Sequence, residues 1–253
     1  FVHESYRQAG FTPETVDTGA VIITGEALKK ENARPISELF AKESGKFICA
    51  SAGPNHEALL AAHGCGAVAL SESESTTVLN IDVGGGTTKL CLIRDGVVTN
   101  TAAVSVGARL IAFDDEDRVT RLEEPAIVLL NELGFDLSLG QSISEPVKQA
   151  FAARMSELLS QVIQKIPLTG VTEEFLITDP LEDYQGPSEV DFVVFSGGVS
   201  EYIYGHDAAS YGDLGPQFAR QIGDSLKAVF KEGTVRQADE GIRATVIGAG
   251  EYT

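Results

Sequence analysis

The stretch Leu79–Ile93, with the sequence LNIDVGGGTTKLCLI, places three consecutive glycines between two apolar segments. Residues 77–83 and 88–93 are short apolar runs, which predict two strands joined by a tight glycine turn. Without a Cβ, glycine lets an anion such as phosphate approach the backbone N–H groups. The turn is therefore interpreted as a phosphate-binding loop, and the alternative is an ordinary glycine-rich hairpin.

The residues of this turn carry the predicted contacts to a nucleotide. Backbone N–H groups and hydroxyls are expected to hold phosphate at Gly84, Gly85, Gly86, Thr87 and Thr88. Asp82 ends the first strand, where a carboxylate can hold Mg²⁺ through water or orient an attacking water molecule, so we interpret it as catalytic residue and metal ligand. The turn is not a Walker A loop, because no Gly-Lys-Ser/Thr follows at the required spacing.

A second glycine motif lies further along the chain. Residues 191–195 form an apolar run, predicted as a strand, that leads directly into Ser196-Gly197-Gly198. Two glycines allow a flat group such as adenosine to lie against the backbone, so Gly197 and Gly198 are predicted to contact the nucleotide. The alternative is a plain strand–turn–helix junction.

The alternation of periodic segments predicts an α/β fold. Helices are expected at residues 1–10, 35–43, 56–70 (capped by Asn55), 144–166 and 216–230. Strands are expected at residues 20–25, 47–50, 77–83, 88–93, 97–101 with an extension over 103–106, 191–195 and 243–247. Three consecutive antiparallel strands after a region of alternating strands and helices indicate a change of architecture near residue 71.

This change suggests two lobes. Residues 1–70 are predicted to be the remainder of a first lobe. Residues 71–106 and 190–253 would form the core of a second lobe with the phosphate and adenosine loops, and residues 107–189 a subdomain inserted in it. The acidic run Asp114–Asp117 within this insertion is interpreted as a solvated turn, because no metal-loop spacing accompanies it.

Composition narrows the classes of partner. The 253 residues carry a formal net charge of −18, which argues against nucleic acid and against a membrane surface, since both require concentrated Lys and Arg. Three separated cysteines without C-x-x-C spacing favour reduced thiols in a cytosolic protein. The chain begins at Phe1 and its only methionine is Met155, so we interpret it as a fragment.

The order of these motifs resembles the superfamily of actin, sugar kinases and heat-shock chaperone ATPases. Residues 79–93 match its second phosphate loop and residues 193–200 its adenosine loop. Residues 56–70 and 246–253 match two hinge helices, whose small residues permit close crossing, simple helix packing being the alternative. The resemblance implies an actin-like (ribonuclease H-like) ATPase fold with mixed sheets covered by helices. The first phosphate loop is missing, which we interpret as truncation.

Five segments are similar to one family within this superfamily, the ethanolamine ammonia-lyase reactivating factors. They are AVIITGE (20–26), ASAGPNH (50–56), NIDVGGGT (80–87), FSGGVSE (195–201) and RATVIGAG (243–250). The resemblance implies a slow ATPase that uses ATP and Mg²⁺ to exchange damaged cobalamin for adenosylcobalamin in its partner, ethanolamine ammonia-lyase. It also implies Thr24 and Glu26 as metal-side contacts, a plain turn being the alternative. A cytoplasmic location with a microcompartment association follows, and a homo-oligomer is left open.

Two other functions compete with this interpretation. A small-molecule kinase or other ATP-using enzyme of the same superfamily would need a base beside the acceptor hydroxyl. The polar stretch directly before the phosphate loop offers only Glu72 and Glu74, and nothing in this serine-rich segment positions them, which disfavours that function. A filament-forming protein is disfavoured because no segment identifies a longitudinal interface.

Overall fold

A computed structural model describes residues 2–12, 15, 19–23, 47–51 and 53–251. Thr24, Glu26 and the helix predicted over residues 35–43 lie outside these ranges. In the N-terminal region, helix α1 (Val2–Ala9) and the parallel strand pair β1 (Gly19–Ile23) and β2 (Phe47–Ser51) agree with the predicted elements.

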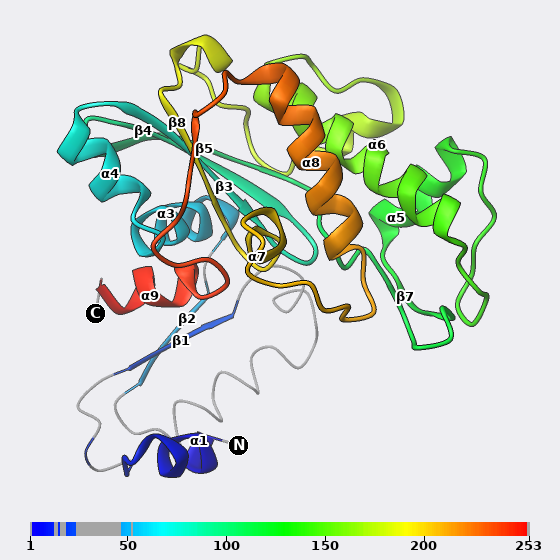
Figure 1. Ribbon diagram of the computed structural model, residues 1–253, viewed down its shortest axis with the longest axis horizontal. Helices are drawn as coiled ribbons and strands as arrows, with labels where there is room; N and C mark the ends of the chain where they lie inside the picture. Colours follow the sequence, from blue (N-terminus) through cyan, green and yellow to red (C-terminus); the bar gives the residue numbers. More distant parts are fainter. Residues whose placement is uncertain (1, 13–14, 16–18, 24–46, 52, 252–253) are drawn as a thin grey trace.

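A mixed five-stranded sheet forms the centre of the molecule (Figure 1), with the strand order β5-β4-β3-β8-β9. Its strands are β3 (Thr77–Val83), β4 (Thr88–Arg94), β5 (Val97–Val104), β8 (Phe192–Ser196) and β9 (Val235–Arg236). The first three are antiparallel, whereas β8 runs parallel to β3. The strands predicted on both sides of the glycine turn are confirmed, as is the strand before Gly197.

The register of this sheet brings the two glycine motifs together. Asp82 lies opposite Lys89 on β4 and opposite Ser196 on β8. Because β3 and β8 are parallel, their carboxyl ends meet at the same edge of the sheet, where open α/β sheets commonly place a ligand. The turns that follow the two strands are therefore neighbours in space.

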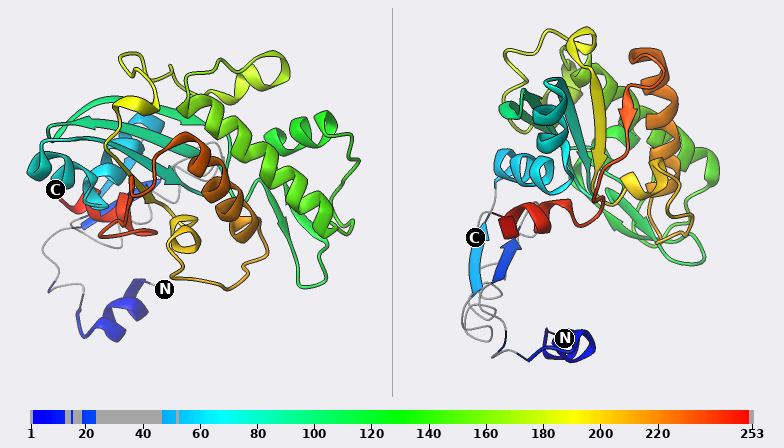
Figure 2. Two further views of the ribbon diagram at one scale, coloured as in Figure 1. Left: turned by 45° about the horizontal axis from the view of Figure 1, so that its top comes forward. Right: turned by 60° about the vertical axis from the view of Figure 1, so that its left-hand side comes forward.

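Helices cover both faces of the sheet (Figure 2), giving three layers. One face carries α3 (Pro54–Gly64), α4 (Ala67–Glu74) and α9 (Ala244–Glu251), and the other carries α6 (Glu145–Ile163) and α8 (Gly215–Val229). Alternate strand residues point to opposite faces. Val78 and Val194 accordingly pack with the first group, and Leu79 and Val193 with the second.

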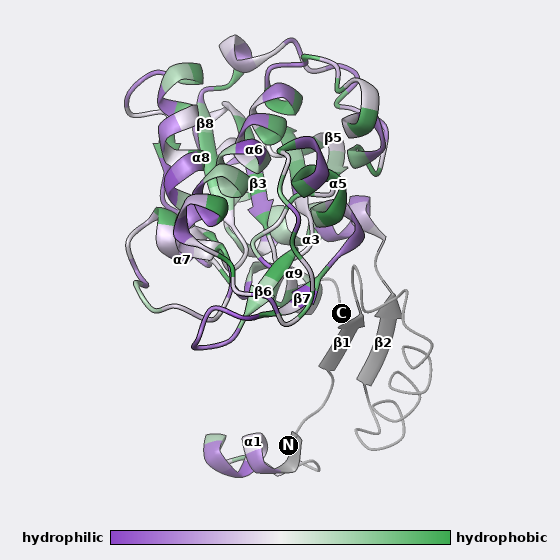
Figure 3. Cartoon of the chain, turned by 90° about the vertical axis from the view of Figure 1, so that its right-hand side faces the viewer, coloured by the Kyte–Doolittle hydropathy of each residue, from purple (hydrophilic) through white to green (hydrophobic). Residues whose placement is uncertain are grey.

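The remaining elements form smaller units beside the sheet. Strands β6 (Ile111–Phe113) and β7 (Val119–Leu122) make an antiparallel pair, followed by α5 (Glu124–Glu132). Figure 3 shows hydrophobic residues on β6 and β8, and mixed hydropathy along α8. The short helices are η3 (Gly170–Phe175), η4 (Pro187–Glu189) and α7 (Ser200–Ile203).

Across the part of the chain that the structure describes, no helix is both long and apolar enough to cross a membrane.

The predicted helix over residues 56–70 is wrong in its extent, because the structure has two helices there. Gly66 adopts a left-handed conformation with φ 82°, which separates α3 from α4. The predicted cap is also wrong. Gly53 occupies the N-cap position and Pro54 opens the first turn, so Asn55 lies inside the helix.

The strand predicted over residues 243–247 is also wrong, because residues 244–247 belong to helix α9. A short apolar run containing β-branched residues has no periodicity that separates strand from helix. Tertiary packing decides here, since α9 crosses α3 through a contact of small residues. Residues 246–251, which lie within the segment matched to a hinge helix, are helical.

Candidate functional site

A cavity of about 450 Å³ lies at the edge of the sheet where β3 and β8 end. Gly84 and Gly85 of the first motif and Gly198 of the second all line it. Arg109 and Asp213 complete its wall from two further segments. The sequence motifs that were predicted to bind phosphate and adenosine therefore contribute to one cavity.

The glycine turn is held from behind by a loop that the sequence analysis did not identify. The N–H groups of Ala108 and Arg109 donate to the carbonyl oxygens of Gly84 and Gly85 at 3.1 and 2.6 Å. A Cβ on Gly107 would lie 2.5 Å from the Gly85 oxygen, so glycine is required for this approach. The turn is thereby fixed before any ligand arrives, as preorganised binding requires.

Within the turn, the predicted phosphate donors are not equivalent. The N–H of Gly84 donates to the carbonyl of Thr87 at 3.0 Å, which closes the turn and engages this predicted phosphate donor within the turn itself. Thr88 is buried and its hydroxyl donates to the carbonyl of Val106 at 2.8 Å, so it faces the interior. Gly86 and Thr87 belong to the turn but do not line the cavity.

The second motif needs its two glycines for different reasons. Gly197 has φ 83°, and a Cβ there would lie 2.4 Å from the carbonyl oxygen of Val83. It therefore lets the two strand ends approach each other and lies outside the cavity lining. Gly198 lines the cavity, and a Cβ there would meet only the Ile242 side chain, at 3.8 Å. Gly198 is thus the glycine of this motif that faces the cavity, and its contact with adenosine stays a prediction.

Asp82 lies beneath the glycine turn and is engaged by neighbouring side chains. It is buried, with 4% of its surface exposed. One oxygen accepts a hydrogen bond from Ser196 Oγ at 3.0 Å, and the other lies 3.6 Å from Lys89 Nζ. Asn80 in turn donates to Ser196 Oγ at 3.3 Å. These contacts fix the orientation of the carboxylate.

Lys89 joins Asp82 to helix α3. Its ammonium lies 2.8 Å from Glu57 Oε2, and both side chains are buried. Burial by itself lowers the pKa of Lys89, but the negative charges of Asp82 and then Glu57 outweigh it, so the pKa is raised. The sequence analysis missed both residues; a lysine directly before the apolar residues LCLI of β4 was the available signal for Lys89.

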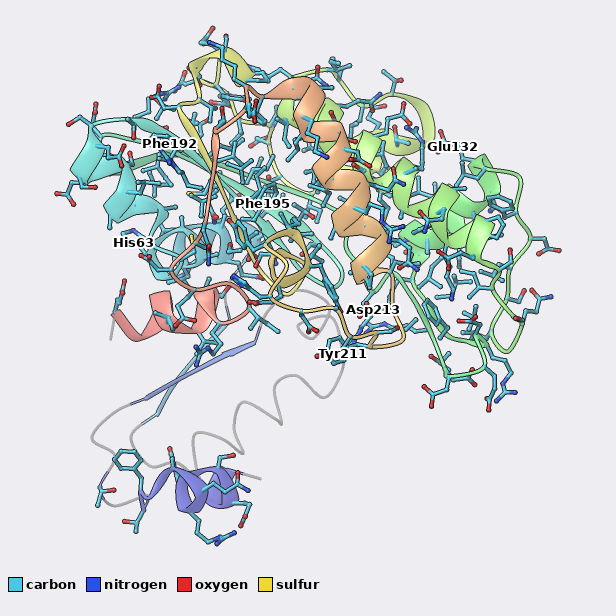
Figure 4. All side chains as sticks on the ribbon, in the orientation of Figure 1. His63, Glu132, Phe192, Phe195, Tyr211 and Asp213 are labelled. Atoms are coloured by element: carbon cyan, nitrogen blue, oxygen red, sulfur yellow. The ribbon has the colours of Figure 1, made fainter. Side chains whose placement is uncertain are left out.

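The far wall of the cavity offers a cation and aromatic surfaces. Arg109 Nε donates to Asp213 Oδ2 at 3.1 Å, while Asp213 Oδ1 accepts the N–H of Gly215 at the start of α8. Figure 4 shows Tyr211 and Asp213 close together on the loop that leads to α8. Tyr202 also lines the cavity, and burial with nearby acids raises its pKa to about 12. Such rings and such a guanidinium suit a planar, anionic ligand.

The predicted contacts of Asp82 and Thr24 with Mg²⁺, which for Asp82 would run through water, stay predictions. Mg²⁺ requires oxygen ligands at about 2.0–2.1 Å in near-octahedral geometry. The oxygens of Asp82 instead face Ser196 and Lys89, and Thr24 lies outside the described residues. Over those ranges, no group of three or more His, Cys, Asp or Glu side chains could hold a metal ion.

Comparison with known proteins identifies one matching family. The family model described as ethanolamine utilisation protein EutA matches residues 1–253. The chain is 37% identical over 253 residues to the ethanolamine ammonia-lyase reactivase EutA of Escherichia coli (strain K12), covering 99% of this chain and 53% of the relative. The reactivase of Salmonella typhimurium (strain LT2) is 35% identical over 252 residues, with 98% and 52% covered. The chain spans about half the length of these curated relatives.

Solved structures bear on the fold. The Aquifex aeolicus member of the Ppx/GppA protein family superposes with a TM-score of 0.57 at 16% identity, covering 99% of this chain and 79% of that one. At this identity the likeness concerns the fold alone. The chain has an actin-like ATPase fold with a mixed sheet covered by helices, which confirms the predicted fold class.

Proposed function

The chain belongs to the ethanolamine utilisation protein EutA family, and we propose that it is part of an ATP-dependent reactivating chaperone for ethanolamine ammonia-lyase. The chaperone would promote exchange of damaged cobalamin for intact adenosylcobalamin in that enzyme. The two curated relatives, each named as an ethanolamine ammonia-lyase reactivase, support the choice of partner. We further propose a cytoplasmic location, with association with an ethanolamine-utilisation microcompartment.

One observation carries the ATP part of the proposal, namely that Gly84, Gly85 and Gly198 line a single cavity. Its volume of about 450 Å³ is in the range of small-molecule sites. The phosphates would lie against Gly85, and the adenosine against Gly198. Tyr202 and Tyr211 offer ring surfaces for the base.

The charges around the cavity define separate roles for its side chains. Arg109, which is half exposed, can turn from Asp213 toward a phosphate oxygen. Asp82, fixed by Ser196, would orient the water that attacks the terminal phosphate. Mg²⁺ would enter with the nucleotide, neutralising its phosphates. Slow hydrolysis is sufficient for such a switch, because hydrolysis only sets how long each conformation lasts.

Conformational coupling would run through helix α3. Glu57 on this helix pairs with Lys89 beneath the phosphate turn, and the same helix crosses α9 at the predicted hinge. If ATP and ADP differ in affinity for open and closed arrangements of the lobes, hydrolysis shifts their populations. The change of arrangement would then act on the bound lyase and release its damaged cofactor.

The proposal is tested by incubating the full-length protein with ATP, Mg²⁺, adenosylcobalamin and ethanolamine ammonia-lyase blocked by cyanocobalamin. Ammonia release should recover, and omitting ATP should prevent recovery. Failure to recover ammonia release with all components present contradicts the chaperone function. A parallel screen of small alcohols and sugars distinguishes a kinase, for which substrate would strongly stimulate ATP turnover.

A further inference from the structure

Three buried charges meet beneath the glycine turn and come from three different elements. The ammonium of Lys89, on β4, lies 2.8 Å from Glu57 of α3 and 3.6 Å from Asp82 of β3. The side chains of these residues are only 9%, 4% and 5% exposed, respectively. A Cβ on Gly84 would lie 3.8 Å from the same ammonium, so this cation also adjoins the phosphate turn.

This arrangement differs from an ordinary buried ion pair. Lys148, the other buried lysine that the structure describes, meets Asp117 at 2.5 Å, and that carboxylate is half exposed. Lys89 instead faces two carboxylates that are both buried. Removing water from two carboxylates is costly unless a cation compensates them, so a positive charge at this point is a requirement of the fold.

We propose that Lys89 is the built-in cation of this site and occupies the place that a divalent metal ion would otherwise take between Asp82 and Glu57. The position beside two buried carboxylates is where Mg²⁺ or Mn²⁺ would bind if it were open. With the ammonium present, a divalent ion there would face a like charge within a few ångströms. Asp82 is therefore not a metal ligand in the native protein.

Lys89 also affects nucleotide binding, a statement that rests on the proposed function. Without any metal, Lys89 offsets one of the two negative charges that lie under the phosphate turn. Mg²⁺ then contributes through the nucleotide phosphates and not through a protein carboxylate at this point. In the native protein, removing Mg²⁺ should reduce the affinity for ATP. Replacing Lys89 with a neutral residue should reduce that affinity by a larger factor.

The direct test uses Mn²⁺ alone, without nucleotide, on the full-length protein, with bound metal counted by electron paramagnetic resonance. The native protein should show no tight Mn²⁺ site that depends on Asp82. Lys89→Met removes the charge but keeps an unbranched apolar side chain, and it should gain one tight Mn²⁺ site per chain. That site should disappear when Asp82→Asn is added to Lys89→Met.

Lys148→Met is the matched control, because it also removes a buried lysine but leaves no pair of buried carboxylates. It should gain no Mn²⁺ site, and a tight site in Lys148→Met equal to that in Lys89→Met would overturn the inference. A tight site in the native protein that Asp82→Asn abolishes would overturn it as well. So would the absence of any gain in folded Lys89→Met.

Stability provides a second readout if Lys89→Met folds poorly. A ligand that binds only the folded state raises Tm as its concentration increases. Tm of Lys89→Gln, or of Lys89→Met where it folds, should be lowered and should recover as Mn²⁺ is added, whereas native Tm should not respond. If neither variant folds even with Mn²⁺, the inference is tested by whether the native protein has a tight Mn²⁺ site that Asp82→Asn abolishes. These assays contain no ATP and no lyase, so their outcome is independent of whether the chaperone function holds.

Discussion

Gly64 of α3 and Gly248 of α9 lie backbone against backbone where the two helices cross. A Cβ on Gly64 would lie 1.9 Å from the carbonyl oxygen of Ala244, and a Cβ on Gly248 would lie 1.9 Å from that of Leu60. Neither approach leaves room for a side chain, and the obstacle is backbone on both sides. This crossing therefore holds α3, and with it Glu57, at a defined position beside the site.

The first prediction concerns this crossing. Gly248→Ala should lower the free energy of unfolding by about 1–3 kcal/mol, because the helices must separate to admit the methyl group. Gly250→Ala is the control on the same helix, since its Cβ would meet nothing within 4 Å. It should be neutral or stabilising by about 0.5–1 kcal/mol. Urea denaturation measures the free energy of unfolding of both variants. Equal effects of the two substitutions would show that the close crossing does not contribute to stability.

The second prediction concerns Arg109. Arg109→Met should weaken ATP binding by about 10–100-fold, as expected for the loss of a hydrogen bond to a charged group, while adenosine binding changes little. Arg118→Met is a suitable control, because Arg118 pairs with Asp114 in the exposed turn between β6 and β7. Calorimetric titration of ATP and of adenosine separates the two effects. If ATP and adenosine lost affinity equally, Arg109 would not contact the phosphates.

The third prediction concerns Gly198. Its Cβ would make only an ordinary contact with Ile242, so Gly198→Ala should fold like the native protein. The added methyl group should nevertheless crowd the adenosine and weaken ATP binding by about tenfold or more. Gly223→Ala, in the middle of α8 with open space at its Cβ, should bind ATP normally. Unchanged affinity in Gly198→Ala would place the adenosine elsewhere.

The fourth prediction concerns pH. Burial raises the pKa of the Cys65 thiol from 9.0 to about 12. Because the folded pKa exceeds the unfolded one, the contribution to stability is complete below pH 9 and is lost as the pH rises from 9 toward 12. At pH 9, Cys65 should react slowly with iodoacetamide in the native protein and rapidly in urea. Peptide mass spectrometry identifies the labelled cysteine, and rapid native labelling of Cys65 would mean that it is accessible.

The two glycine turns and the strands before them could be predicted from the sequence, because each turn and its strand form one short continuous segment. The apolar runs before Gly84 and before Gly197 are short and uninterrupted, and each glycine turn follows its strand directly. Two parallel strands that end together then place both turns at one edge. The break at Gly66 was missed because a left-handed glycine inside a helical pattern resembles an ordinary helical glycine.

The remaining features depend on contacts between distant segments. Residues 244–248 have the β-branched pattern of a strand, but they form a helix whose Gly248 packs against α3, a contact between distant segments. Lys89 and Glu57 belong to different elements, so their ion pair becomes visible only when α3 is placed against β4. The support that Arg109 gives to the glycine turn is likewise a backbone contact that side-chain chemistry does not reveal.

The central claim is that the cavity lined by Gly84, Gly85 and Gly198 binds ATP. A crystal structure of the full-length protein with a non-hydrolysable ATP analogue tests it most directly. The account predicts phosphate density against the turn Gly84–Thr87 and adenosine density against Gly198. Nucleotide bound at another place, or an empty cavity at a saturating analogue concentration, would contradict it.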